Sequence, residues 1–162
     1  MLEFVVVPWG MIGSQVLDAM DYACYAHDVE HVVLDNLQFM LSGQGKGYDR
    51  FENQDRAIEK FRRFATDKNV HVTLVIHPRK EQDGEPLGIT SVFGGAKATQ
   101  EADNILVLQH VVKQTQEGGE VGFKYVEVKK NRYDGELGRV YLKFLKNYST
   151  FTEETNLRNI RI

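Results

Sequence analysis

The fold class is decided by two short apolar segments, HVVLD at residues 31–35 and VHVTLVIH at residues 70–77. Both are rich in β-branched residues and both end in polar ones, which is typical of strands buried on both faces of a parallel sheet. Between them, Ile58, Phe61 and Phe64 recur at helical spacing. A strand, a helix and a second strand in this order predict part of a mostly parallel α/β sheet.

Further elements extend outward from this centre. A strand is expected at Phe4–Val7, a helix from Gly13 to about His27, a glycine-rich loop at residues 42–50, a short helix within Ser91–Ala102 and another strand at Ile105–Leu108. From Val121 onward, apolar and polar residues alternate between turn sequences such as YDGELG. That alternation predicts antiparallel hairpin strands at the C-terminal edge of the sheet.

Composition narrows the class of protein. The 162 residues are 42% hydrophobic and 27% charged, with one cysteine, Cys24, which we expect to be a small buried thiol. Apolar runs stay well short of the roughly 20 residues that span a bilayer. The formal net charge is −3, so binding to nucleic acid requires a local basic patch or assembly into a ring or filament.

Polar residues follow the two central strands. Asp35 ends the first strand, where open α/β folds bind ligands, and it is a candidate Mg²⁺ ligand through water or a simple turn cap. His77 ends the second strand, where it could bind a terminal phosphate or be a half-buried residue bonded to a carbonyl.

Three cationic or glycine-rich groups are weaker candidates. Arg79 and Lys80 open a polar loop, residues 79–90, whose acidic residues offset their charge. The paired glycines Gly94 and Gly95, with Lys97 nearby, suit close approach of the backbone to an anion or the start of a helix. The cations Lys130 and Arg132 suit a charge-stabilising finger or an exposed hairpin end.

The order of the motifs is more specific than any one of them. The chain carries HVVLDNLQFM from residue 31, FRRFATDKNVHVTLVIHPRKE from 61, FGGAKATQEADNILVLQ from 93 and KKNRYDGELG from 129. Over residues 3–151 it closely resembles the RecA-like motor domain of hexameric, DnaB-like replicative DNA helicases. Within that family it is most similar to the mitochondrial Twinkle-like branch.

The resemblance implies a role for each matching residue. Asp35 corresponds to the Walker B aspartate that orders Mg²⁺ with ATP, and His77 to the residue that senses the γ-phosphate. Arg79 and Lys80 open the DNA-binding loop, with Gly94, Gly95 and Lys97 as further DNA contacts. Gln100 links the nucleotide site to the central channel. Lys130 and Arg132 form the pair inserted into the adjacent subunit's site.

The resemblance also implies a setting. It makes ATP and Mg²⁺ the cofactors, and it makes single-stranded DNA and further copies in a ring, a hexamer in the family, the partners. Residues 1–152 are expected to be the C-terminal part of the motor domain, and residues 153–162 a tail. The mitochondrial matrix is expected from the resemblance alone.

Two departures qualify these expectations. Phe93 stands where bacterial members carry a channel arginine, and the sequence contains no G-x-x-x-x-G-K-[ST] phosphate loop. We therefore expect the chain alone not to hydrolyse ATP. The alternatives are a recombinase-like ATPase, a non-catalytic isoform or paralogue that modulates assembly, and an unrelated doubly wound ligand-binding sheet.

Overall fold

The computed structural model describes residues 13–37, 48–78, 86–92, 96–114 and 120–154. The chain forms two compact units, each described by itself below. The first contains residues 1–79 and 92–101, and the second contains residues 80–91 and 102–162. The expected strand Phe4–Val7 and the residues 153–162 expected as a tail, apart from Glu153 and Glu154, lie outside the described residues.

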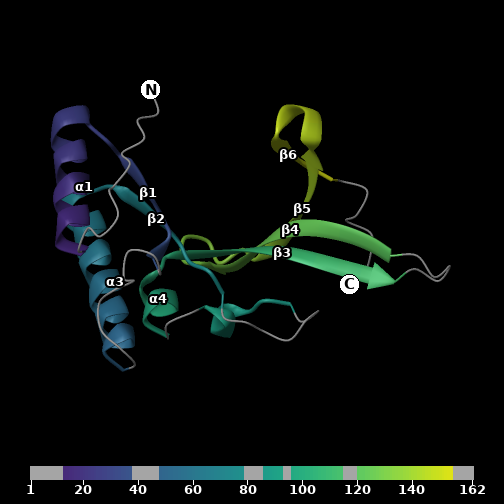
Figure 1. The fold of residues 1–162 in the computed structure, drawn as a ribbon, viewed down its shortest axis with the longest axis horizontal. Coiled ribbons are helices and arrows are strands. Elements are labelled where there is room, and N and C mark those ends of the chain that lie inside the picture. The colour runs from purple at the N-terminus through teal and green to yellow at the C-terminus, as the bar shows by residue number, and fades with distance from the viewer. Residues whose placement is uncertain (1–12, 38–47, 79–85, 93–95, 115–119, 155–162) are drawn as a thin grey trace. The chain divides into compact units, whose positions relative to one another are not determined.

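A parallel strand pair forms the centre of the first unit (Figure 1). Strands β1 (His31–Asp35) and β2 (His71–Val75) pair in register from His31 opposite His71 to Asp35 opposite Val75. The helices of this unit are α1 (Gly13–His27), α3 (Tyr48–Lys68) and α4 (Ala96–Glu101). This arrangement confirms the strand–helix–strand order expected from residues 31–77.

The two long helices end in the same way. Asp28 follows α1 with φ of 51°, and Asn69 follows α3 with φ of 53°. Both residues occupy the left-handed region, which Asn and Asp tolerate better than other non-glycine residues and which turns the chain out of the helix. Each turn leads directly toward a strand of the parallel pair.

One apolar core unites the helices and strands of the first unit. The three side chains expected at helical spacing, Ile58, Phe61 and Phe64, are buried. They pack together with Leu37 and with buried residues of α1, β1 and α4: Val16, Met20, Leu34 and Ala98. Cys24 is half-buried against this core, and its burial raises the pKa of the thiol. Helix α3 begins at Tyr48, within the segment expected to be a loop at residues 42–50.

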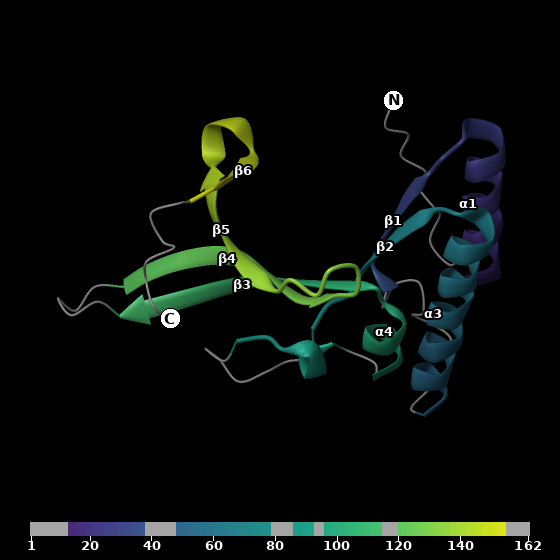
Figure 2. The ribbon, with the colours of Figure 1, turned by 180° about the vertical axis from the view of Figure 1, so that it is seen from behind.

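A four-stranded antiparallel sheet forms the second unit, as Figure 2 shows from behind. Its strands, in spatial order, are β3 (Asn104–Gln114), β4 (Glu120–Asn131), β5 (Gly138–Leu145) and β6 (Thr150–Glu153). Short 3₁₀ turns occur at η1 (Ile89–Ser91) and η2 (Lys146–Tyr148). The antiparallel strands expected after Val121 are confirmed.

The strand expected at Ile105–Leu108 is longer than predicted and pairs differently. It extends to Gln114 as β3 and pairs antiparallel with β4, from Asn104 opposite Asn131 to Gln114 opposite Glu120. Among the described residues, parallel pairing is confined to β1 and β2. The α/β fold class, with a parallel sheet and an antiparallel sheet, is confirmed.

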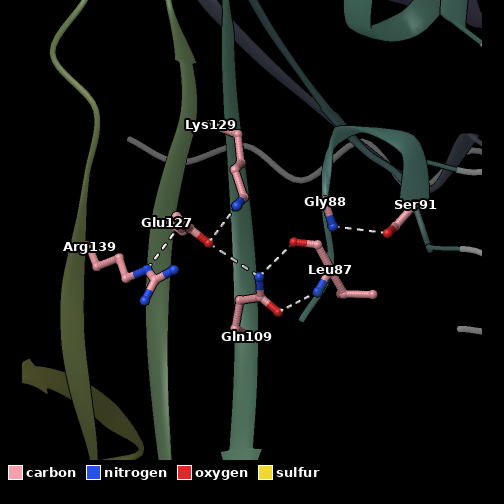
Figure 3. A network of polar contacts seen from close by, with 7 residues as sticks. All are labelled: Leu87, Gly88, Ser91, Gln109, Glu127, Lys129 and Arg139. Carbon is pink, nitrogen blue, oxygen red and sulfur yellow. Dashed lines mark hydrogen bonds and ion pairs between the residues drawn. The ribbon is translucent and has the colours of Figure 1, made fainter. Parts of the chain in front are cut away.

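A buried carboxylate on β4 organises polar contacts across this sheet (Figure 3). Glu127 is 9% exposed and accepts hydrogen bonds from Arg139 Nε at 3.0 Å and Gln109 Nε2 at 3.3 Å, with Lys129 Nζ 2.9 Å away. Burial alone would raise the pKa of Glu127, but the hydrogen bonds from Lys129 and Arg139 hold it below its ordinary value. Arg139 also stacks over the ring of Tyr125, 5.1 Å from its centroid.

Tyr125 and its neighbours form a small aromatic core on this sheet. Tyr125 is 1% exposed and packs with Phe123 and Tyr141. Within the described ranges, no helix is long and apolar enough to cross a membrane.

Glu127 makes the second unit sensitive to acid. Because the folded state favours its ionised form, its contribution is complete above the ordinary glutamate pKa of about 4.3 and is lost as the pH falls through the lower folded-state value. Glu127→Gln should lower the free energy of unfolding by about 1–3 kcal/mol at pH 7, the value of hydrogen bonds to charged groups. The measurement is urea unfolding of both proteins at several pH values.

The difference in the free energy of unfolding between wild type and Glu127→Gln should shrink below about pH 4, because the Glu127 carboxylate protonates in acid. Glu136→Gln, which changes an exposed carboxylate in the turn after β4, is the matched control and should have little effect at any pH. A difference that stays constant or grows in acid would contradict the assignment.

Candidate nucleotide-binding site

The carboxyl ends of β1 and β2 lie at one edge of the parallel pair and carry the first two predicted site residues. Asp35 is the last residue of β1 and lies opposite Val75, the last residue of β2. His77 follows closely, and Asn36 Nδ2 lies 2.8 Å from His77 Nε2. The structure therefore places Asp35 and His77 at the same edge of the sheet, as the sequence predicts.

The contact between Asn36 and His77 indicates which tautomer the neutral imidazole adopts. An amide nitrogen can only donate, so Nε2 of His77 accepts, and the proton of the neutral ring lies on Nδ1. This tautomer is assigned from the hydrogen-bond partner of the ring. His77 is exposed, whereas the alternative interpretation expected a half-buried histidine.

Asp35 is the candidate metal ligand at this edge. It is exposed, and the described residues contain no group of three or more His, Cys, Asp or Glu side chains that could hold a metal. Mg²⁺ commonly takes one or two carboxylates and completes its octahedral shell with water and substrate phosphates. A single accessible carboxylate therefore fits a Mg²⁺ that is held mainly by nucleotide and water.

Helix α4 positions two more of the predicted residues. Ala98 packs into the core of the first unit, while Gln100 is exposed. Lys97 pairs with Glu101 one turn later, with Nζ 3.3 Å from Oε1. Four other predicted DNA contacts lie outside the described residues: Arg79, Lys80, Gly94 and Gly95.

The predicted cationic pair belongs to the second unit. Lys130 lies on β4 opposite Ile105, and Arg132 follows the end of that strand. Arg132 Nη1 donates to Asp103 Oδ1 at 2.9 Å, and its backbone N–H donates to the Asp103 carbonyl at 3.0 Å. The Arg132 side chain is 55% exposed, so this exposed ion pair is weak enough to be exchanged for another anion.

The turn after Arg132 is braced by side chains. Asp134 Oδ1 accepts from the Asn131 side-chain amide and from the backbone N–H of Glu136, and Asn131 Oδ1 accepts from the backbone N–H of Tyr133. Gly135 adopts φ of 77°, which a side chain would strain. The backbone on either side of Arg132 is therefore well fixed, although the guanidinium is accessible.

Sequence reasoning missed two residues at these sites. Asn36 directly follows Asp35, and its position at the strand end was the only available indication. Asp103 precedes β3 and contacts Arg132 across 29 residues of sequence, and no local pattern indicates such a contact.

One protein-family model matches part of this chain. The model of the AAA domain family matches residues 10–83, just under half of the chain. This range includes β1, α3 and β2, and with them Asp35 and His77.

Solved structures match over most of the chain. A DnaB-like replicative helicase, solved for its interactions with primase, is 20% identical with a TM-score of 0.68, over 87% of this chain and 34% of that one. A separately solved ATPase domain is 19% identical with a TM-score of 0.64, over 87% of this chain and 51% of that one. A KaiC-like protein from the hyperthermophilic archaeon Pyrococcus horikoshii OT3 is 13% identical with a TM-score of 0.60, over 88% and 56%.

These likenesses define the fold. The chain has the α/β fold of RecA-like helicase ATPase domains, and it spans about a third to a little over a half of the length of the solved proteins that it matches. The family-model match covers the part of the chain that contains the parallel strand pair, and the structural neighbours show the same fold over most of the chain.

The Asn36–His77 contact can be tested by the tautomer of the ring. In wild type, long-range ¹H–¹⁵N spectra of the neutral ring should show the proton on Nδ1, and Asn36→Ala should remove that preference. His31, whose Nε2 lies 2.8 Å from Thr73 Oγ1, is an internal control and should not change. Unchanged His77 ring shifts in the variant would contradict the contact.

Proposed function

We propose that this chain is the C-terminal part of the ATP-driven motor of a replicative DNA helicase of the DnaB-like family, in its mitochondrial Twinkle-like branch. The observation that carries the proposal is the placement of Asp35 and His77 at one edge of the parallel strand pair, joined through Asn36. That edge is where open α/β sheets bind ligands.

In the proposed mechanism, subunits form a hexameric ring with ATP between neighbours. Asp35 would hold a Mg²⁺ through water, and the ion would supply charge stabilisation at the phosphates. His77 donates from Nδ1 toward the terminal phosphate, and Asn36 keeps that donor in place. Gln100, which is exposed on helix α4, connects this site to the DNA side.

The neighbouring subunit supplies the remaining charge. Arg132 leaves Asp103 and binds the γ-phosphate across the interface, with Lys130 beside it. When hydrolysis removes that charge, Arg132 returns to Asp103 and the interface relaxes. The loops that begin at Arg79 and lie near Lys97 then shift along single-stranded DNA by phosphate contacts, which need no base sequence and weaken with salt.

This 162-residue chain by itself should not hydrolyse ATP. Its sequence has no G-x-x-x-x-G-K-[ST] motif, and the backbone N–H groups and lysine of that loop supply much of the affinity for phosphates. The measurement is phosphate release by the purified chain, compared with a protein-free blank. Turnover that Asp35→Ala abolishes would contradict the prediction.

The trans role of Arg132 can be tested by mixing subunits in the protein that carries the whole motor domain. Arg132→Ala rings should lose DNA-stimulated ATP hydrolysis by about 10³-fold or more, the usual value of an arginine finger, and Asp35→Ala rings should lose it through removal of the Mg²⁺ ligand. Mixed rings should regain part of it, because some interfaces then pair an intact Asp35 with an intact Arg132.

Two controls make the mixing result decisive. Rings mixed with Arg132→Ala/Asp35→Ala double-variant subunits contain no new intact interface and should show no rescue. Tyr133→Ala, which changes an exposed neighbour of Arg132, should behave as wild type. Equal activity of mixed and unmixed variant rings would show that the finger does not act across the interface.

A further inference from the structure

A buried glutamine on the antiparallel sheet binds a distant piece of main chain. Gln109, on β3, is 3% exposed. Its Oε1 accepts from the Leu87 backbone N–H at 2.9 Å, and its Nε2 donates to the Leu87 carbonyl at 2.8 Å (Figure 3). One side chain thus satisfies both backbone groups of Leu87, as a neighbouring strand would.

The orientation of this amide is determined by the charge behind it. Gln109 Nε2 also donates to Glu127 Oε2 at 3.3 Å, and Glu127 in turn contacts Lys129 and Arg139. A carboxylate can only accept, so the nitrogen of Gln109 must face Glu127 and its oxygen must face the Leu87 N–H. The Glu127 carboxylate therefore selects the amide orientation in which Gln109 accepts from the Leu87 N–H and donates to the Leu87 carbonyl.

The residues after Leu87 form a closed turn on this attachment. The Gly88 N–H donates to Ser91 Oγ at 2.9 Å, and the Ser91 N–H donates to the Gly88 carbonyl at 3.1 Å. Ser91 is 5% exposed. These hydrogen bonds hold Leu87 to Ser91 in one turn, and the contact of Gln109 with Leu87 attaches that turn to the sheet.

We propose that Gln109 is a positioning residue that attaches the carboxyl-side end of the DNA-binding loop, residues 79–90, to the antiparallel sheet. The DNA role of that loop rests on the proposed function, whereas the attachment does not. Strand β4, which carries Glu127, also carries Lys130 and leads to Arg132. The described end of the loop, from Leu87, and the cationic pair therefore share one support, so losing the attachment should reduce the response to DNA more than the affinity for ATP.

The attachment is tested first by hydrogen exchange in this chain. Gln109→Leu keeps the size of the side chain and removes two bonds to Leu87, so protection of the Leu87–Ser91 amides should fall about tenfold or more relative to the β4–β5 amides. Gln54→Leu is the matched control, because Gln54 is 2% exposed and lies in the other unit. Unchanged protection in Gln109→Leu, or an equal loss in both variants, would overturn the proposal.

Gln109→Glu adds a pH profile that general destabilisation would not produce. At pH 7 the introduced carboxylate can still accept from Leu87 N–H but cannot donate, and it faces Glu127. Burial and that neighbouring charge raise the pKa of the introduced group, so on acidification it should protonate before Glu127 and donate again. Protection of Leu87–Ser91 should therefore recover as the pH is lowered from about 7. A pH-independent loss would overturn the proposal.

The functional consequence is tested in the protein with the whole motor domain, with oligo(dT) as the DNA probe. Gln109→Leu should lower stimulation of ATP hydrolysis by oligo(dT) roughly fivefold or more, with KM for ATP within about twofold of wild type, as expected when a positioning contact is lost and the nucleotide contacts remain. Full stimulation despite lost loop protection would overturn the positioning role. If wild type itself shows no stimulation, the proposed function fails, and the exchange result still decides whether Gln109 attaches the loop.

Discussion

The parallel pairing of β1 with β2 is the constraint on which the candidate site depends. Five residue pairs, from His31–His71 to Asp35–Val75, bring two strand ends to one edge although 40 residues separate the partners. A shift of one residue would move alternate side chains to the opposite face and separate Asp35 from His77. The core of Leu34, Ile58 and Phe61 opposes such a shift, because it would expose apolar side chains.

The elements of the first unit could be predicted because their patterns are local. Burial of Ile58, Phe61 and Phe64 follows from helical spacing, and the position of Asp35 follows from the apolar strand before it. The extent of β3 could not be predicted as easily. Beyond Leu108, polar residues interrupt the apolar run, and the strand continues because β4 supplies backbone partners as far as Glu120.

The contacts that fix side chains in place were beyond sequence reasoning for a different reason. Asn36 with His77, Asp103 with Arg132 and Gln109 with Leu87 each join residues separated by 22 or more positions. A hydrogen bond between distant polar groups leaves no periodicity in the sequence. Motif order made His77 and Arg132 candidates, but it did not indicate the groups that contact them.

The net charge of the chain is −3, and two of its candidate anion-binding cations are held by carboxylates. Among the described residues, Lys97 pairs with Glu101 and Arg132 with Asp103, both partly exposed. Such pairs contribute only about 0–1 kcal/mol, so a phosphate can replace the carboxylate at little cost. The ion pairs keep these two cations oriented, and each cation can still exchange its carboxylate for a phosphate.

The buried group at Glu127 behaves in the opposite way. Its carboxylate has two cationic partners and an amide, and removal of the carboxylate would leave two cations without their shared partner. Replacing the Glu127 carboxylate with an external anion is therefore costly, which is typical of a structural group and not of a ligand site. The second unit thus combines a permanent ionic group, which orients Gln109, with an exchangeable one at Arg132, and strand β4 connects the two.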